Sequence, residues 1–415
     1  MQRFLTRHRW VVLACSITVQ CLTNFVAVWA VYQPYVAAEY GYTSDTATLV
    51  MSTCNLFFGV LSIAGGRVQD RVSPRFAAVV GVLGVTLNFF IAWWIPGGEP
   101  LFMYAGFCLF FGGGCGFLNQ ATTATLLKYY PDRKGFATGF SSAASAVYII
   151  VLTYLSEAMI GRLGVRLSLL AMGGVTLVVG LGCALLLAAP PEPYIAEKSA
   201  LAPVPAHTGA GGSVDFTPAQ VLRTPQYYLL IGSVILALPA FQLINPQLVS
   251  LCMARGLDKE LALSATAIAS AATAVGRFTV PTLSDRFGRR RTMAAMWAAT
   301  ALCLAAFMTV SGPAMVGSWA ALSLVYSGGY VMLGAFTNDL FGFRNSGSNI
   351  GLTNLSNTIG SLLGPVLLTA LTPAFGGNTV YYIGIGGTLL ATGCVLLIRT
   401  DMAREKARLE ARAAC

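Results

Sequence analysis

A single arginine, Arg277, lies within a long apolar segment of the sequence, residues 261–284. A guanidinium at membrane depth costs about 2.5–3.5 kcal/mol on insertion scales, so it must face a bundle interior or a water-filled cavity. Arginine stays protonated and presents a planar fork of donors that matches a carboxylate. No Asp or Glu lies well inside any apolar segment, since Glu157 and Asp339 lie at segment ends. Arg277 is therefore predicted to bind a small organic anion, and structural pairing or carbonyl capping is the alternative.

Polar side chains at a similar depth are candidates to bind the rest of such an anion. Counted from the predicted cytoplasmic segment ends, Arg277 is 7 residues deep, Asn119 and Asn357 are 8, and Tyr330 is 10. At 1.5 Å per residue they form one layer, about 10–15 Å from the inner surface. An interior Asn or Tyr is as often a helix–helix contact as a ligand contact, so each position keeps both interpretations. The further candidates are Tyr326, Tyr382 and its neighbour Tyr381.

The composition indicates what must position these side chains. The chain has 415 residues, of which 56% are hydrophobic and 10% charged, with a mean hydropathy of +0.69. Soluble domains carry about 25% charged residues. The composition thus excludes a soluble enzyme, a nucleic-acid-binding domain and a secreted disulfide scaffold. The ten cysteines form no CxxC pair and no catalytic motif is present, so no metal, no cofactor and no enzymatic activity are expected.

Twelve apolar runs are long enough to span a membrane, which takes about 20 residues. They are 10–32, 45–66, 76–95, 101–127, 136–158, 167–189, 227–249, 261–284, 292–310, 315–340, 349–371 and 380–398. The only long polar interruption, 190–226, is rich in Pro and Gly, as linkers are. The predicted fold class is an all-α membrane protein with twelve transmembrane helices in two six-helix bundles. The bundles are 1–189 and 227–398, with a cytoplasmic linker at 190–226 and a cytoplasmic tail at 399–415.

The basic residues predict the orientation. With both termini in the cytoplasm, the cytoplasmic segments hold 21 Lys and Arg and the outer loops hold four. Positive residues accumulate on the cytoplasmic side of membrane proteins, so the formal charge of +10 is a topology signal and does not imply nucleic acid. The chain is expected to lie in a membrane lipid bilayer, in a prokaryotic inner membrane, and to function as a monomer.

An internal repeat relates the two predicted bundles. Residues 66–75 read GRVQDRVSPR after the second span, and residues 283–291 read LSDRFGRRR after the eighth. Three pairs of residues recur at a spacing of 215: Asp70 with Asp285, Arg71 with Arg286, and Arg75 with Arg290. Two six-span halves in the same orientation form a parallel repeat.

These loops resemble the signature of the major facilitator superfamily, although Ser73 and Pro74 replace its usual Gly-Arg pair. The resemblance implies two bundles that rock about a central cavity. It also implies that Asp70, Arg71, Arg75, Asp285, Arg286 and Arg290 form gating loops that steady one state through neighbouring helix ends. A plain positive-inside anchor with a tight turn is the alternative for the first loop.

Two further elements resemble the oxalate/formate antiporter subfamily and the related monocarboxylate porters. They are VLRTPQYY at 221–228 and KYYPDRKG at 128–135. Both subfamilies place a substrate-binding arginine in the eighth span, at the position that Arg277 matches. The oxalate antiporter pattern has a second basic residue in the eleventh span, where this chain has Asn357. The animal monocarboxylate porters have an aspartate one turn before the arginine, where this chain has Thr273, which puts proton coupling through that pair in doubt.

The predicted function is secondary active transport of short monocarboxylates such as lactate or pyruvate, by alternating access and with proton symport. One fixed positive charge suits a monoanion, because a dianion would leave one charge unmatched in a low-dielectric site. Exchange of oxalate for formate, with a counter-anion in place of the proton, is the alternative from the same residues. Efflux of drugs or cations is a lower alternative, since it usually needs a buried acid and none is visible.

Overall fold

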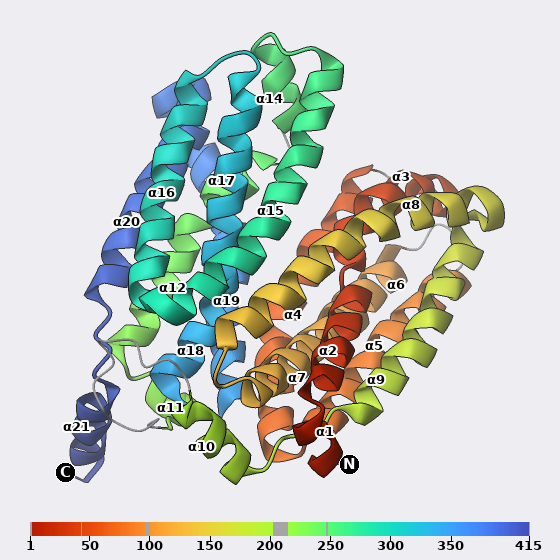
Figure 1. Cartoon of the computed structure of the whole chain (residues 1–415). Coiled ribbons are helices and arrows are strands. Elements are labelled where there is room, and N and C mark those ends of the chain that lie inside the picture. Colours follow the sequence, from red (N-terminus) through yellow and green to blue (C-terminus); the bar gives the residue numbers. More distant parts are fainter. Residues whose placement is uncertain (1, 43, 96–99, 202–214, 246–247, 415) are drawn as a thin grey trace. The chain divides into compact units, whose positions relative to one another are not determined.

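The computed structural model describes residues 2–42, 44–95, 100–201, 215–245 and 248–414, which form helices and no strand (Figure 1). The chain divides into two compact units. The first contains Met1–Pro131, Ala144–Leu201 and Arg344–Leu352. The second contains Asp132–Ala143, Ala202–Phe343 and Thr353–Cys415. The predicted linker contributes two short helices, and its residues 202–214 lie outside the described part of the chain.

Nine helical segments of the described residues are long and apolar enough to cross a membrane. The longest, Lys134–Leu186, has 53 residues and departs from helical geometry at Gly164, whose φ is 76° and ψ is 171°. Glycine tolerates this left-handed conformation because it has no Cβ. The bend divides the segment into the predicted fifth and sixth spans. The predicted all-α membrane fold is confirmed.

The first unit is built on an aromatic core. Phe25 packs with ring centroids 4.9 Å from both Phe89 and Tyr32, and Trp29 lies 4.8 Å from Phe107. All these side chains are buried. The helices of this unit are α1 (Gln2–Arg7), α2 (Arg9–Thr23), α3 (Phe25–Tyr40), α4 (Ser44–Arg71), α5 (Pro74–Trp94), α6 (Pro100–Ala105), the π-helical η1 (Gly106–Gly112), α7 (Gly113–Tyr129), most of α8 (Lys134–Val175), the π-helical η2 (Thr176–Gly180), α9 (Leu181–Leu186) and α10 (Glu192–Ala200).

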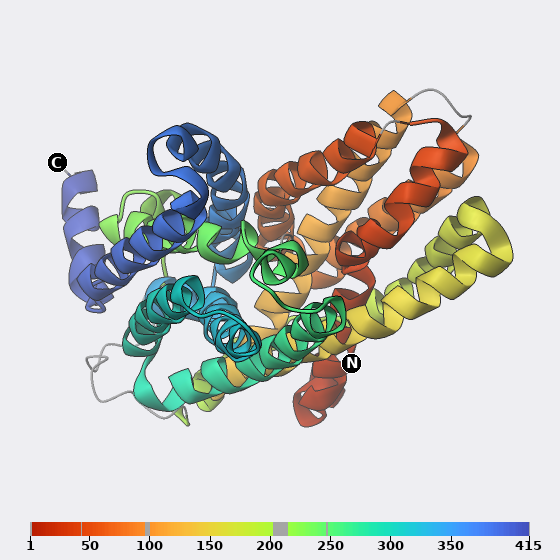
Figure 2. The ribbon, with the colours of Figure 1, turned by 90° about the horizontal axis from the view of Figure 1, so that it is seen from above.

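The second unit packs around a stack of aromatic rings. Phe241 lies between Trp319 and Tyr326, with centroid distances of 5.3 and 4.7 Å and nearly parallel planes. Helices α15 and α17 run side by side, as do α16 and α20 (Figures 1 and 2). The helices of this unit are α11 (Pro218–Val221), α12 (Pro225–Ala237), α13 (Pro239–Gln242), α14 (Leu248–Ala254), α15 (Lys259–Phe287), α16 (Arg289–Thr309), α17 (Ala314–Val331), α18 (Leu333–Phe341), most of α19 (Ser346–Phe375), the 3₁₀ turn η4 (Gly376–Asn378), α20 (Thr379–Leu397) and α21 (Met402–Ala414).

Local sequence explains several helix ends. Ser73 begins α5, since its hydroxyl accepts a bond of 3.1 Å from the Phe76 N–H and Pro74 occupies the first helical position. Thr224 and Pro225 begin α12 in the same way. Within the predicted span at 227–249, Pro239 has no N–H to donate. The helix is interrupted there, between α12 and α13. The same predicted span continues into α14, and residues 246–247 before α14 lie outside the described part of the chain.

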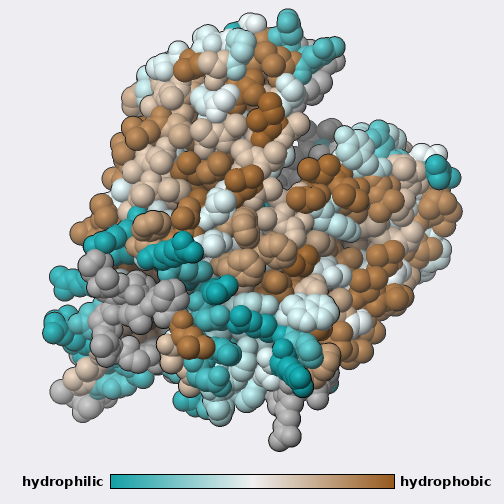
Figure 3. Space-filling view, viewed as in Figure 1, coloured by the Kyte–Doolittle hydropathy of each residue, from teal (hydrophilic) through white to brown (hydrophobic). Residues whose placement is uncertain are grey.

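The outer faces of the helices carry large hydrophobic side chains. Trp94, Tyr154, Val178 and Leu302 each expose more than 70% of their surface. Figure 3 shows hydrophobic residues along the helix walls and hydrophilic residues gathered at helix ends. Soluble monomers rarely expose apolar patches of this extent, whereas a bilayer solvates them.

Two helices contribute to both units. The start of α8 clusters with the second unit, and the start of α19 clusters with the first. The bundle boundaries expected from the sequence, 1–189 and 227–398, stay a prediction.

Candidate functional site

Arg277 lies in the middle of α15 and is half-buried. Its Nε atom is fully buried and has no hydrogen-bond partner. None of the ion pairs found in the described chain includes Arg277. A buried donor without a partner is costly, and a buried cation without a counter-charge is more so. The side chain thus has the capacity to accept an anionic ligand.

Two glycines bring α15 and α17 into close contact beside this arginine. A Cβ added at Gly276 would collide with the carbonyl group of Leu324, and one added at Gly328 would lie 2.5 Å from the Val280 Cβ. The Ser327 hydroxyl donates to the Thr273 carbonyl at 3.2 Å across the same crossing. Small residues at a helix crossing let the backbones approach closely. This crossing sets the position of Arg277 relative to α17.

Tyr326 and Tyr330 lie close enough to Arg277 for electrostatic interaction. The two tyrosines differ in their surroundings. Tyr326 is 7% exposed and stacks on Phe241, so its ring belongs to the core of the unit. Tyr330, one turn later, is half-buried. Of the two predicted contacts on α17, Tyr330 is therefore the better placed to bind a ligand of Arg277.

The first turns of α8 form a third wall of this region. A Cβ at Gly139 would lie 2.7 Å from the Arg277 carbonyl oxygen and 3.0 Å from that of Phe278. The Phe278 ring also packs on Phe136 and Phe140, with centroids about 6 Å away. The backbone at Arg277 is thus held between α8 and α17, both within the second unit.

Replacing Gly276 with valine is expected to force α15 away from α17. The Leu324 carbonyl is backbone and cannot rotate aside, and overpacking of this kind costs about 1–3 kcal/mol. We expect a lower thermal unfolding midpoint and a roughly tenfold loss of transport. The matched control is Gly317→Val on α17, where an added Cβ meets no atom within 4 Å. Equal behaviour of the two variants would contradict the close crossing.

Asn357 lies on α19 and is half-buried. One turn earlier, the Thr353 hydroxyl accepts a bond of 3.1 Å from Thr337 of α18. No hydrogen bond in the described chain joins Asn357 to Arg277. Counted from the first residue of α19, Asn357 is 11 residues along the helix, and Tyr330 is 11 residues before the end of α18.

Asn119 belongs to the first unit, on α7, where it is half-buried. It lies 10 residues before the end of α7 at Tyr129, and Arg277 lies 10 residues before the end of α15 at Phe287. The four predicted residues, Arg277, Tyr330, Asn119 and Asn357, thus each lie 10 or 11 residues from a helix end. At 1.5 Å per residue this is a distance of about 15–17 Å along each helix. Their joint role in binding stays a prediction.

The two adjacent tyrosines of α20 have different environments. Tyr381 is 3% exposed, and its hydroxyl accepts a 2.7 Å bond from the Arg255 guanidinium, which also donates to the Phe307 carbonyl at 2.8 Å. Arg255 thereby closes the end of α16. Tyr382 is 47% exposed, and its ring lies 5.9 Å from that of Phe375. Of the two adjacent tyrosines that the sequence offered as candidates, Tyr381 is bonded to Arg255, and Tyr382 remains the candidate for binding.

Removing each hydroxyl should separate these roles. In Tyr381→Phe, Arg255 loses one acceptor, and we expect a loss of about 1 kcal/mol of unfolding free energy with an unchanged substrate KM. In Tyr382→Phe, stability should stay within about 0.5 kcal/mol of wild type. Thermal unfolding and uptake kinetics on both proteins measure this. A stability loss in the Tyr382 variant alone would reverse the assignment.

The loop after α4 is anchored to the start of α19. The Asp70 carboxylate accepts bonds from the backbone N–H groups of Gly347 at 3.1 Å and Ser348 at 2.7 Å. Lys128 lies 3.8 Å from the same carboxylate. The N-terminus of a helix carries a partial positive charge and unpaired N–H groups, so a carboxylate stabilises it. These residues all lie in the first unit.

The loop after α15 repeats this arrangement in the second unit. Asp285 accepts bonds from the N–H groups of Gly135 at 3.0 Å and Phe136 at 3.1 Å, at the start of α8. Asp285 lies 215 residues after Asp70 in the sequence. Its donors, Gly135 and Phe136, lie 212 residues before Gly347 and Ser348, which are the donors to Asp70. The internal repeat therefore extends from the loop sequences to the helix ends that they hold.

A buried charge network surrounds the second loop. Asp339 pairs with both Lys134 and Arg289, and Arg289 also donates to Asp285 at 2.6 Å. The Arg289 side chain is 7% exposed. In the sequence, Asp339 stands only at a segment end, and no motif predicts a role for Arg289, Lys134 or Lys128. The i,i+4 spacing of Asp285 and Arg289 is the one local signal that could have found the pair.

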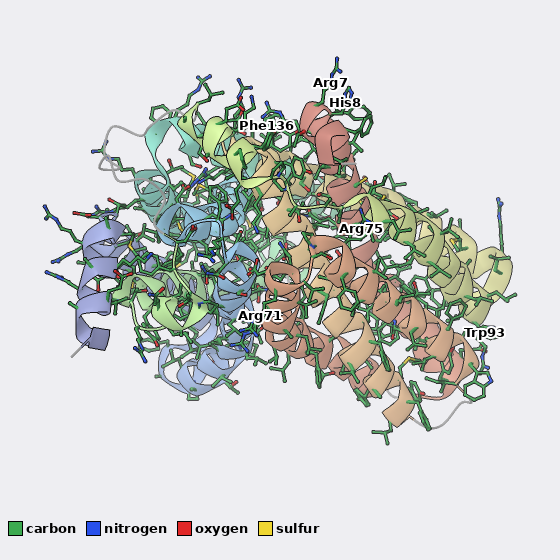
Figure 4. All side chains as sticks on the ribbon, turned by 90° about the horizontal axis from the view of Figure 1, so that it is seen from below. Arg7, His8, Arg71, Arg75, Trp93 and Phe136 are labelled. Carbon is green, nitrogen blue, oxygen red and sulfur yellow. The ribbon has the colours of Figure 1, made fainter. Side chains whose placement is uncertain are left out.

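The remaining loop arginines differ in exposure. Arg71 and Arg286 are exposed, whereas Arg75 and Arg290 are half-buried. Arg290 donates to the Leu396 carbonyl near the end of α20. Figure 4, in which the molecule is seen from below, shows Arg71 and Arg75 in separate places. Arg71 is at the end of α4 and Arg75 is at the start of α5. Gating by these six loop residues stays a prediction.

The helical walls, the apolar outer faces and the repeated charged loops define a multi-pass membrane protein of the transporter class. The chain belongs to the Major Facilitator Superfamily, whose family model matches residues 13–258 and 230–414. It is an integral membrane transporter of that superfamily, and the resemblance predicted from the loops is confirmed.

Two curated relatives are carboxylate carriers by name. The oxalate:formate antiporter of Oxalobacter formigenes is 22% identical over 406 residues, covering 96% of this chain and 93% of the relative. Monocarboxylate transporter 9 of Rattus norvegicus is 26% identical over 178 residues, covering 40% of this chain and 33% of the relative. Among solved structures, the fucose:proton symporter FucP of E. coli has a TM-score of 0.68 at 14% identity, covering 94% of this chain and 98% of FucP. The structural similarity establishes the fold alone.

Proposed function

We propose that this transporter moves short monocarboxylates, such as lactate or pyruvate, across the membrane by alternating access with proton symport. The observation that carries the proposal is the buried Nε atom of Arg277, which has no hydrogen-bond partner. A carboxylate would supply both the missing acceptor and the missing charge. The substrate is then bound by Arg277, and Tyr330, Asn119, Asn357, Tyr382 and Tyr326 are the proposed contacts to its remaining atoms.

The charge of the site favours a monoanion. Arg277 is a single fixed cation, and Asn357 occupies the position where the oxalate antiporter pattern has a second basic residue. An amide can donate to a hydroxyl or keto oxygen but cannot neutralise a second carboxylate. Substrates with one carboxylate and one neighbouring oxygen therefore match the donors best.

The same residues are compatible with a different coupling mode. When the substrate leaves, the positive charge of Arg277 has no counter-charge. Release of the anion is therefore easier if a proton leaves with it or if a second anion takes its place. Proton symport uses a protonated carboxylate for this purpose, and exchange uses a counter-anion. The coverage of the oxalate:formate antiporter, 96% of this chain, supports exchange as the second candidate.

The basic residues support an orientation for this cycle. We infer that both termini are cytoplasmic and that the anchored loops after α4 and α15 face the cytoplasm. We also propose that the protein lies in a prokaryotic inner membrane and that it functions as a monomer.

Uptake of labelled L-lactate into proteoliposomes tests the function. An inward proton gradient should drive uptake that unlabelled pyruvate inhibits and oxalate does not. No lactate uptake under any gradient, together with exchange when oxalate or formate is loaded inside, would replace the proposal by anion exchange. Absence of both activities would exclude short carboxylates as substrates.

A further inference from the structure

Two cysteines of the first unit, Cys15 on α2 and Cys183 on α9, meet across a helix contact. Their thiols lie within hydrogen-bond distance of each other, and Cys183 also contacts the hydroxyl of Thr18, one turn after Cys15. Helices α2 and α9 pack side by side, and a Cβ added at Gly180, just before α9, would lie 3.3 Å from the Leu22 side chain. Nothing in the proposed transport cycle uses this pair of thiols.

The pair lies close to one end of both helices. Cys15 is six residues after the first residue of α2, Arg9, and Cys183 is three residues before the last residue of α9, Leu186. At 1.5 Å per residue, both cysteines are within about 5–9 Å of these helix ends. The basic residues Arg7 and Arg9 are typical of a membrane boundary. A small uncharged oxidant therefore has to pass only the first turns of the bundle to reach the thiols.

The two thiols differ in exposure. Cys15 is 6% exposed, whereas Cys183 is half-buried, and both are free cysteines. Oxidation of a cysteine pair begins at the more accessible thiol, and a neighbouring thiol then resolves the oxidised intermediate. Cys183 is thus the thiol that an oxidant meets first, and Cys15 is the resolving thiol.

We propose that Cys15 and Cys183 are a redox modification site, at which a hydroperoxide such as hydrogen peroxide forms a reversible disulfide. In the first step, the Cys183 thiolate attacks one oxygen of hydrogen peroxide. The O–O bond breaks, Cys183 becomes a sulfenic acid, and the released hydroxide takes up the thiol proton as water. In the second step, the Cys15 sulfur attacks the Cys183 sulfur, the S–O bond breaks, and the hydroxyl leaves as water with the Cys15 proton.

This sequence of steps is balanced. The two thiols together lose two electrons, and one hydrogen peroxide is reduced to two waters. A dithiol reductant such as dithiothreitol reverses the bond by thiol–disulfide exchange. The disulfide joins α2 to α9 within the first unit and leaves Arg277, which lies in the second unit, unmodified.

Fragment mapping of the full-length protein in a neutral maltoside detergent tests this inference independently of any transported substrate. Cyanogen bromide cleaves after methionine, which places Cys15 in the fragment 2–51 and Cys183 in the fragment 173–253. The protein is treated with hydrogen peroxide, unfolded in SDS with N-ethylmaleimide, isolated as the monomer band and cleaved. The two fragments should then migrate as one species on a non-reducing gel and separate after dithiothreitol. The number of alkylated thiols, measured by mass, should fall by two from the ten of the chain.

Four serine variants identify the pair. Cys15→Ser and Cys183→Ser should each abolish the linked species, because each removes one of its two sulfurs. The matched controls are Cys21→Ser and Cys252→Ser, which remove the other cysteine of each fragment. Cys21 lies on the same helix as Cys15, but its thiol contacts the Ser145 hydroxyl. Both controls should give the wild-type yield of the linked species.

Two results would overturn the inference. One is that the wild-type fragments stay separate at a peroxide dose that fully oxidises glutathione in the same detergent. The other is a linked species that survives in Cys15→Ser or Cys183→Ser, which would assign the disulfide to a different pair. Should one of these two variants fail to fold, the other decides alone, since the disulfide needs both sulfurs.

Discussion

Replacing Arg277 with alanine should reduce uptake of the transported carboxylate at least a hundredfold. Truncating one member of a buried, hydrogen-bonded charge pair costs about 2–5 kcal/mol, and each 1.4 kcal/mol is a factor of ten. The loss should appear in both the apparent KM and the maximal rate, because the substrate loses its only fixed counter-charge. Uptake of labelled lactate by reconstituted wild type and variant measures it.

The fold should not suffer from this change. The Arg277 Nε atom has no hydrogen-bond partner, so alanine removes a costly buried group and breaks no bond at that atom. We expect the thermal unfolding midpoint of Arg277→Ala to equal or exceed that of wild type. The control is Arg291→Ala, an exposed arginine of the same unit, which should keep both midpoint and uptake. A destabilised Arg277→Ala protein would indicate a structural role for the arginine, and unchanged uptake would remove it from the site.

Replacing Asp339 with asparagine should cause the largest loss of stability. The change leaves Lys134 and Arg289 facing each other without the carboxylate that pairs with both. Breaking a buried ion pair costs about 3–5 kcal/mol. The Asp339 side chain keeps 30% exposure, so screening by solvent lowers our expectation to about 2–3 kcal/mol. That corresponds to a fall of roughly 4–12 °C in the thermal unfolding midpoint.

A matched control separates buried from surface pairing. Asp401 pairs with Arg404 at 3.1 Å, but these side chains are 56% and 87% exposed. Asp401→Asn should therefore change stability by less than about 0.5 kcal/mol. Comparable losses in the two variants would show that burial of the Asp339 network contributes nothing.

The coupling within the network can be measured directly. Lys134→Met and Asp339→Asn remove adjacent members, and Lys134 also starts α8, whose next two N–H groups are held by Asp285. The double variant should be less destabilised than the sum of the single variants, because removal of Lys134 leaves one fewer unpaired cation. Additive losses would mean that the two residues act independently.

The internal repeat was predictable from the sequence because loop chemistry is local. The Asp-Arg pairs at Asp70 and Asp285 recur at a fixed spacing, and each must follow directly from a span. The partners of these aspartates were not predictable. The N–H groups of Gly347 and Gly135 lie far from them in the chain, and backbone donors leave no residue signature. Only the packing of α19 and α8 brings these donors to the carboxylates.

The helix breaks show the same difference between features that the sequence predicts and features that depend on packing. The bend at Gly164 lies between the predicted spans 136–158 and 167–189, which hydropathy had already separated. Hydropathy alone did not show the break at Pro239, within the predicted span 227–249. A run of apolar residues indicates that a segment lies in lipid. Whether the helix breaks within that segment depends on its local backbone hydrogen bonds and on the residues that pack beside them.

The sequence by itself determined the membrane class and the twofold repeat, and it singled out Arg277 as the candidate binding residue. The membrane class and the lone cation follow from the free energy of transferring side chains into a bilayer, whereas the repeat follows from residues that are local to each loop. The tertiary structure alone decided that Gly276 and Gly328 hold α15 against α17 beside Arg277. It also decided that Tyr326 stacks on Phe241, that Tyr381 accepts a bond from Arg255, and that Asp339 joins two cations. These features depend on close approach between distant segments, and close approach is a property of packed surfaces that composition and periodicity do not encode.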